Sequence, residues 1–176
     1  MPDSRNGRPS RELLVRLGQA ACGNALAYLD DVRALVAAGR DVRAFALTVM
    51  ASEEMAKAFW CWRVLQDPSE EAQRSWSAVT GRGGQHQHRL AVGLALEHVV
   101  VEFSPDDETA RLLSGLNPGQ LFDLRNAAMY AEVANGEIWS PRTMLGSQSM
   151  EGLRVALVKS VAAHTVILQA ELHAME

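Results

Sequence analysis

The sequence predicts an all-α fold, an antiparallel bundle of four to five helices with short extra helices. Three observations support this class. Long segments repeat apolar residues at spacings of three and four, Gly and Pro fall between those segments, and we find no convincing strand pair. Four long helices joined by short connections are typical of an antiparallel bundle.

The length and composition indicate one globular domain. The chain has 176 residues, with 22% charged and 48% hydrophobic residues, both ordinary for a globular protein. We expect a disordered tail over residues 1–9 and a single helical domain over residues 10–176. The net charge of −4 gives no overall positive potential that would attract nucleic acid.

The sequence also predicts a cytoplasmic protein without a membrane partner. Residues 1–11 are polar and rich in arginine, unlike a secretory signal. No uncharged apolar stretch approaches the roughly 20 residues that a membrane helix needs. Cys22 and Cys61 both lie in apolar helical patterns, so we expect two reduced cysteines in the core.

The first two helices have clear boundaries in the sequence. Ser10 can cap a helix that runs to about residue 38, and Gly39 stands where such a helix stops. The next helix begins near Asp41 and ends by Gln66, before an Asp-Pro pair.

The remaining elements are predicted from caps, turns and periodicity. In order along the chain, we expect a short helix over about 67–79, a long helix over 85–103, a short helix over 104–115, a turn at 117–119, a helix over 120–130, a break at 134–137, an irregular segment over 138–146 and a last helix over about 149–174.

The second helix is apolar nearly all the way round, yet it carries Glu53, Glu54 and Lys57. This pattern predicts a helix at the centre of the bundle, where partly buried charges must be paired. Glu53 and Lys57 are four residues apart with the acid first, so we expect them to form an ion pair. Such a pair either fixes the helix register or orients a neighbouring polar group.

Candidate catalytic residues lie at the end of the helix over 120–130. Arg125, followed by Asn126, can neutralise a phosphate, and Tyr130 can move a proton. The alternative is that the arginine pairs with an acid and the tyrosine packs at a helix end.

A basic segment over residues 72–90 contains three arginines, two histidines and no acid. Its residues Arg82, His88 and Arg89 are candidate contacts for an anionic partner. The alternative is a solvated helix start after a glycine-rich loop. No Glu-x-x-His pair, phosphate-binding loop or dinucleotide motif is present, so we expect no metal and no cofactor.

The order of these motifs resembles the AbiV family of abortive-infection proteins, a branch of the HEPN superfamily. The similarity covers about residues 20–145. It rests on Asn24, Asp30-Asp31, Gly39-Arg40, the Glu-Glu-x-x-Lys segment 53–57, His86-x-x-Arg89, the segment from Arg125 to Tyr130, Gly136, Trp139 and Pro141.

The resemblance implies a HEPN-like bundle that forms a homodimer and acts in bacterial defence against phage. HEPN ribonucleases cleave RNA without metal, using an arginine and a histidine four to six residues later. Arg125 and Asn126 match the start of that motif, but Tyr130 stands at the histidine position.

Three hypotheses follow from the sequence. The first is a defence protein that binds a phage-encoded protein or an RNA-containing target. The second is a metal-independent ribonuclease toxin that uses Arg125 with Tyr130 or His86. The third is a helical module with only a structural or ligand-binding role.

Overall fold

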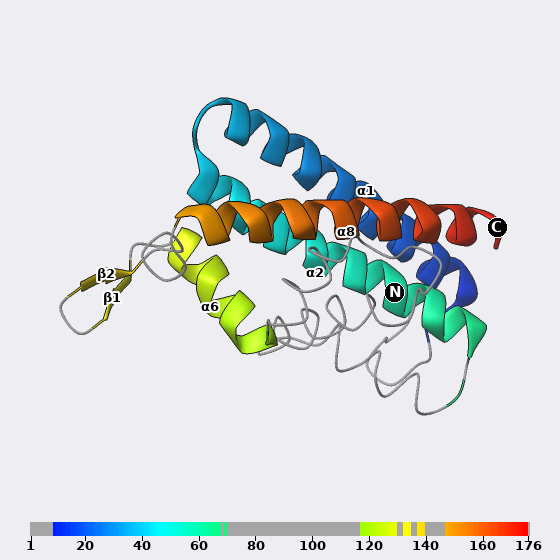
Figure 1. Cartoon of the computed structure of the whole chain (residues 1–176). Coiled ribbons are helices and arrows are strands. Elements are labelled where there is room, and N and C mark those ends of the chain that lie inside the picture. The colour runs from blue at the N-terminus through cyan, green and yellow to red at the C-terminus, as the bar shows by residue number, and fades with distance from the viewer. Residues whose placement is uncertain are drawn as a thin grey trace, which may run out of the picture.

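A computed structural model of the chain describes residues 9–67, 69, 117–129, 132–134, 137–139 and 147–175. These residues form four helices and one small hairpin (Figure 1), which confirms the all-α class. The helices are α1 (Arg11–Ala37), α2 (Asp41–Gln66), α6 (Pro118–Met129) and α8 (Ser147–His173), and the strands are β1 (Glu132–Ala134) and β2 (Glu137–Trp139).

The boundaries of α1 agree with the prediction. Ser10 caps its start, because the Ser10 hydroxyl accepts a hydrogen bond from the backbone N–H of Leu13 at 3.2 Å. At the other end Gly39 has a φ of 68°, a conformation in which glycine carries no steric penalty. The short connection turns the chain back, so that α2 runs antiparallel to α1.

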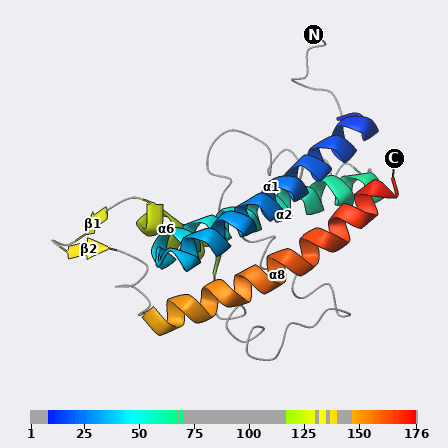
Figure 2. The same ribbon diagram turned by 90° about the horizontal axis from the view of Figure 1, so that it is seen from above.

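Helix α2 lies at the centre of the bundle, as its apolar composition predicts. It contacts α1, α6 and α8, and Figure 2 shows α8 running alongside the α1–α2 pair. One core cluster joins the first half of α2 to α6 and α8, and includes Phe45, Val49, Leu121, Leu124, Met150 and Leu157. A second cluster joins its second half to α1 and α8, and includes Ala25, Leu29, Met55, Val161, Leu168 and Leu172. Among these residues, burying each Val, Leu, Phe or Met side chain stabilises the fold by roughly 1.5–3 kcal/mol.

The three long helices approach closely at Gly18. A Cβ atom placed on Gly18 would lie 2.7 Å from Leu172 Cδ1 and 3.1 Å from Cys61 Cβ. The missing side chain therefore lets α1 pack directly against both α2 and α8.

The start of α6 corrects one prediction. Asn117, Pro118 and Gly119 do not form a separate turn, because Pro118 and Gly119 are the first residues of the helix. The side chain of Asn117 accepts a hydrogen bond from the backbone N–H of Gln120 at 2.9 Å, and the Gln120 side chain accepts one from the backbone N–H of Asn117 at 3.2 Å. This reciprocal cap, followed by proline, is a strong helix start.

A β-hairpin corrects two further predictions. Strands β1 and β2 pair antiparallel, with Glu132 opposite Trp139 and Ala134 opposite Glu137. The chain does contain a strand pair, and Ile138 lies in β2, not in an irregular segment. Strands of three residues are too short to show alternation clearly, although Asn-Gly between two such segments is a known hairpin signal.

Helix α8 begins and ends within two residues of its predicted limits. Its segment Met150–His173 is long and apolar enough to cross a membrane, but 44% of the best window is buried inside the molecule. A core helix has the same composition, so this segment is weak evidence for a membrane span. The helices predicted over 67–79, 85–103 and 104–115 lie outside the described residues, apart from positions 67 and 69.

Candidate functional site

An ion pair joins α6 to the centre of the bundle. Arg125 on α6 donates from Nη1 to Glu53 Oε1 on α2 at 2.6 Å. The side chains are 14% and 6% exposed, so water screens this pair little. Two segments 72 residues apart in sequence are held together here by a charged contact.

The Arg125 guanidinium has two further neighbours on its own helix. Its Nη2 donates to Asn126 Oδ1 at 3.0 Å, and its Cζ lies 4.9 Å from the centre of the Phe122 ring. A guanidinium carries five N–H donors in one plane, and the ring can attract its charge from the face. These contacts together fix the position and orientation of the guanidinium.

Lys57 has a different partner from the predicted one. Its Nζ donates to Glu54 Oε1 at 2.5 Å, and Glu54 Oε2 also accepts from Asn24 Nδ2 on α1 at 3.2 Å. The predicted Glu53–Lys57 pair is therefore wrong. Lys57 and Glu54 are three residues apart and also face each other on a helix. Glu53 forms its ion pair with Arg125 of α6, and Lys57 forms its ion pair with Glu54.

The structure thus divides the acidic pair of α2 between two neighbouring helices. Glu53 binds α6 through Arg125, and Glu54 binds α1 through Asn24. Sequence reasoning missed the contacts of Asn24 and Phe122. For Phe122 a signal existed, because it precedes Arg125 by three residues, the spacing of helix neighbours.

Several candidate residues lie outside the part of the chain that the structure describes. These are Tyr130, His86, His88, Arg82 and Arg89. The structure therefore brings together Glu53, Arg125 and Asn126, and their roles in catalysis or binding remain predictions.

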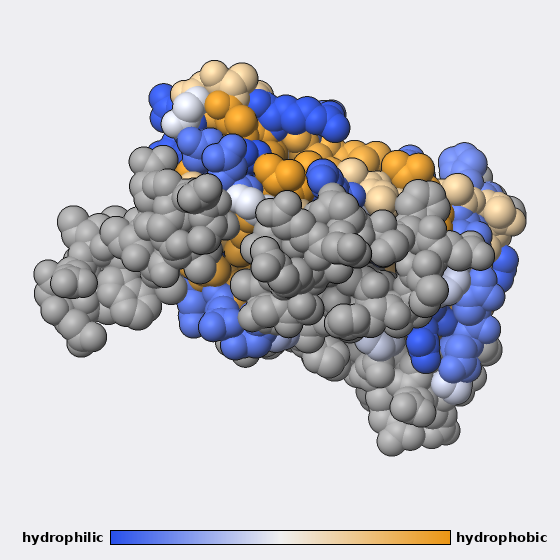
Figure 3. All heavy atoms as spheres, in the orientation of Figure 1, coloured by the Kyte–Doolittle hydropathy of each residue, from blue (hydrophilic) through white to orange (hydrophobic). Residues whose placement is uncertain are grey.

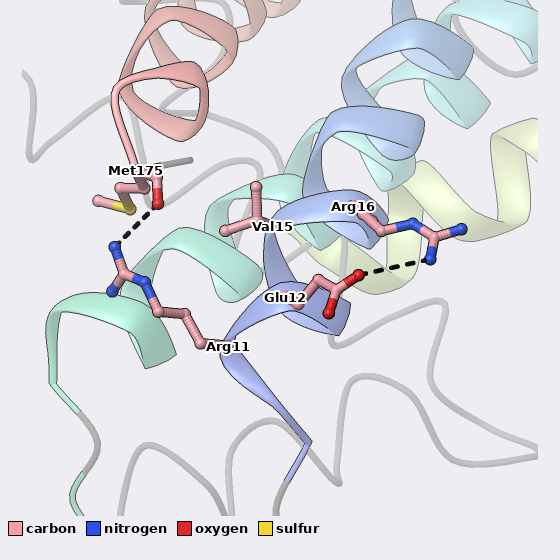
Figure 4. A pocket seen from close by; sticks show the side chains of 5 residues that line it. All are labelled: Arg11, Glu12, Val15, Arg16 and Met175. Carbon is pink, nitrogen blue, oxygen red and sulfur yellow. Dashed lines mark hydrogen bonds and ion pairs between the residues drawn. The ribbon is translucent and has the colours of Figure 1, made fainter.

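A separate pocket lies where α1 begins and α8 ends (Figure 4). Its volume is about 370 Å³, and its lining residues are Arg11, Glu12, Val15, Arg16 and Met175. Arg11 donates to the backbone carbonyl of Met175 at 3.0 Å, and Arg16 lies 3.9 Å from Glu12 in an exposed pair. Of the predicted site residues that the structure describes, none lines this pocket.

The two cysteines are buried free thiols. Burial raises the pKa of Cys22 to about 11 and that of Cys61 to about 12, although the charge of Lys57 lowers the latter. Both thiols are protonated at neutral pH, so neither is an activated nucleophile. Within the described residues, no three His, Cys, Asp or Glu side chains are grouped so that they could hold a metal ion.

Comparison with models of protein families shows the family of the chain. A family model of the HEPN group, described as AbiV, matches residues 13–157. The chain belongs to the AbiV family. No curated protein and no solved structure matches the chain. The AbiV match covers most of α1, all of α2 and α6, and the hairpin, so both ion pairs of α2 lie within the family segment.

Proposed function

We propose that this AbiV-family protein is an abortive-infection protein that acts by binding a phage-encoded protein or an RNA-containing target. Family membership supports the role in defence. The ion pair between Arg125 and Glu53 supports binding as the mechanism, because it occupies the residue that a ribonuclease would use.

Cleavage of RNA needs a cation that stabilises charge on the phosphate and a group that takes a proton. The charge of Arg125 is balanced by a carboxylate at 2.6 Å. Tyr130 stands where HEPN ribonucleases have histidine, and a tyrosine at its ordinary pKa of about 10 is only about 0.1% ionised at pH 7. Both features favour binding over cleavage.

We also propose that the protein acts in the cytoplasm of the infected cell as a homodimer. The homodimer is what the resemblance to the AbiV family implies, and the cytoplasm is where a phage-encoded protein or an RNA-containing target would be met. Exposed apolar residues on the bundle, including Val155 at 40% and Val166 at 58% on α8, provide surface for such contacts. Figure 3 shows apolar residues among hydrophilic ones on one face of the molecule.

The mechanism can be tested with purified protein and bulk cellular RNA in EDTA. Wild type and Arg125→Ala are compared by the length distribution of the RNA after incubation. We expect intact RNA with both proteins. Cleavage by wild type and none by the variant would instead establish the metal-independent ribonuclease.

The defence role can be tested in cells. Expression of wild type should reduce the number of phage plaques relative to an empty vector. Affinity capture from infected cells, with and without ribonuclease treatment, then separates the two target classes. A partner that survives ribonuclease is a protein, and one that is lost with the RNA is an RNA-containing target.

A further inference from the structure

We infer that Glu53 is an internal competitor for Arg125, so that an RNA phosphate binds Arg125 in competition with the Glu53 carboxylate. This inference rests on the proposed function, since it takes RNA as the target class. It assigns Glu53 a regulatory role at the same site and not only a structural one.

The contacts of Arg125 hold its guanidinium in place against an anionic oxygen. Its Cζ lies over the Phe122 ring at 4.9 Å from the ring centre, its Nη2 donates to Asn126, and its Nη1 donates to an anionic oxygen at 2.6 Å. A carboxylate and a phosphate present similar oxygen pairs to a guanidinium, and arginine binds both in the same way. The Glu53 carboxylate therefore occupies the place of an external anion.

Electrostatics then set the strength of the competition. With Glu53 ionised, the pair carries no net charge, and an approaching phosphate meets the negative charge of a carboxylate that lies 2.6 Å from Arg125 Nη1. Only 6% of the Glu53 side chain is exposed, so solvent screens its repulsion weakly. Replacement of Glu53 by glutamine removes the negative charge, keeps the shape and leaves an oxygen that can still accept from Arg125.

Glu54 provides a matched control on the adjacent residue. It has the same charge and is 16% exposed, but it binds Lys57 and Asn24 in place of Arg125. A general effect of removing one acid from α2 should be equal for Glu53→Gln and Glu54→Gln. An effect through Arg125 should appear only with Glu53→Gln.

The test measures binding of a fluorescein-labelled, 2′-O-methyl single-stranded RNA by fluorescence anisotropy in EDTA and low salt. The modified RNA cannot be cleaved through its 2′ oxygen. We expect Glu53→Gln to bind about tenfold more tightly than wild type, at the low end of the coupling measured for close charge pairs. Glu54→Gln should stay within about threefold of wild type, because Glu54 binds Lys57 and Asn24 and not Arg125. Glu53→Gln combined with Arg125→Gln should lose the gain.

Three results would overturn the inference: equal affinity of Glu53→Gln and wild type, an equal gain in Glu54→Gln, or a gain that persists without Arg125. Circular dichroism checks that each variant is folded. If Glu53→Gln does not fold, Glu53→Asp withdraws the carboxylate by one methylene and should give a smaller gain, and no gain there also overturns the inference. Failure of the proposed function appears separately, as wild-type protein that gives no protection against phage.

Discussion

Glu53 and Glu54 are adjacent in the sequence, yet Glu53 binds Arg125 on α6 while Glu54 binds Lys57 and, on α1, Asn24. Consecutive residues of a helix point about 100° apart, so one acidic pair can reach two different neighbours. Helix α2 thereby contacts α6 through a part-buried ion pair and α1 through an exposed hydrogen bond.

The stability cost of breaking an ion pair should follow its burial. Arg125→Ala removes an ion-pair partner of a carboxylate that is 6% exposed, and we expect a loss of about 3–5 kcal/mol in the free energy of unfolding. Lys57→Ala breaks a pair that is 20% and 16% exposed, and should cost about 1–2 kcal/mol, between the ranges for exposed and buried pairs. Urea unfolding measures both.

Arg33→Ala is the control for this series. It breaks a pair with Asp30 in which both side chains are 71% exposed, so stability should change little. If Lys57→Ala lowers the free energy of unfolding as much as Arg125→Ala does, the two ion pairs do not differ in burial as described.

The close approach of three helices at Gly18 predicts opposite effects of alanine at two glycines of α1. Gly18→Ala places a methyl group 2.7 Å from Leu172 Cδ1 and should destabilise by about 1–3 kcal/mol. Gly23→Ala meets nothing within 4 Å and should stabilise by up to about 1 kcal/mol through helix propensity. Thermal melting of the two variants beside wild type would show shifts of opposite sign, and shifts of equal sign would contradict the packing.

The cap of α6 predicts a local loss of stability. Asn117→Ala removes the oxygen that accepts from the backbone of Gln120 and should cost about 1 kcal/mol. Asn117→Asp keeps that acceptor and should stay close to wild type. Chemical unfolding of both variants measures this, and an equal loss in the two would show that the side-chain cap is not the cause.

The buried thiols predict a fall in stability at alkaline pH. In the unfolded chain both thiols ionise near pH 9, whereas the folded chain keeps Cys22 protonated up to about 11 and Cys61 up to about 12. Between these values the unfolded state binds fewer protons, so the free energy of unfolding falls by up to about 1.4 kcal/mol per pH unit for each thiol. Below pH 8 the thiols contribute little slope, because few unfolded thiols are ionised there.

This dependence can be isolated by urea unfolding between pH 7 and about 10.5, the range in which unfolded thiols ionise. Wild type is compared with a Cys22→Ala, Cys61→Ala double variant, which should be less stable at pH 7 but fall less steeply above pH 9. If the free energy of unfolding falls in parallel with pH for the two proteins, burial does not keep the thiols protonated.

The sequence by itself determined the helical class, the limits of α1, α2 and α8 to within about two residues, and the central place of α2. Caps such as Ser10 and Gly39, and an apolar pattern that surrounds a whole helix, are local properties of the chain. The hairpin and the start of α6 are local too, but their signals, Asn-Gly and the Asn117–Gln120 cap, fit a break and a turn equally well in the sequence alone.

Only the tertiary structure decided which acid of α2 pairs with which cation. Helical spacing allows Lys57 to bind either Glu53 or Glu54, since neighbours at three and four residues both lie within reach. The choice depends on Arg125, which arrives from 72 residues away when α6 packs against α2. A pairing that a distant helix sets through packing leaves no trace in the local spacing of the residues it joins.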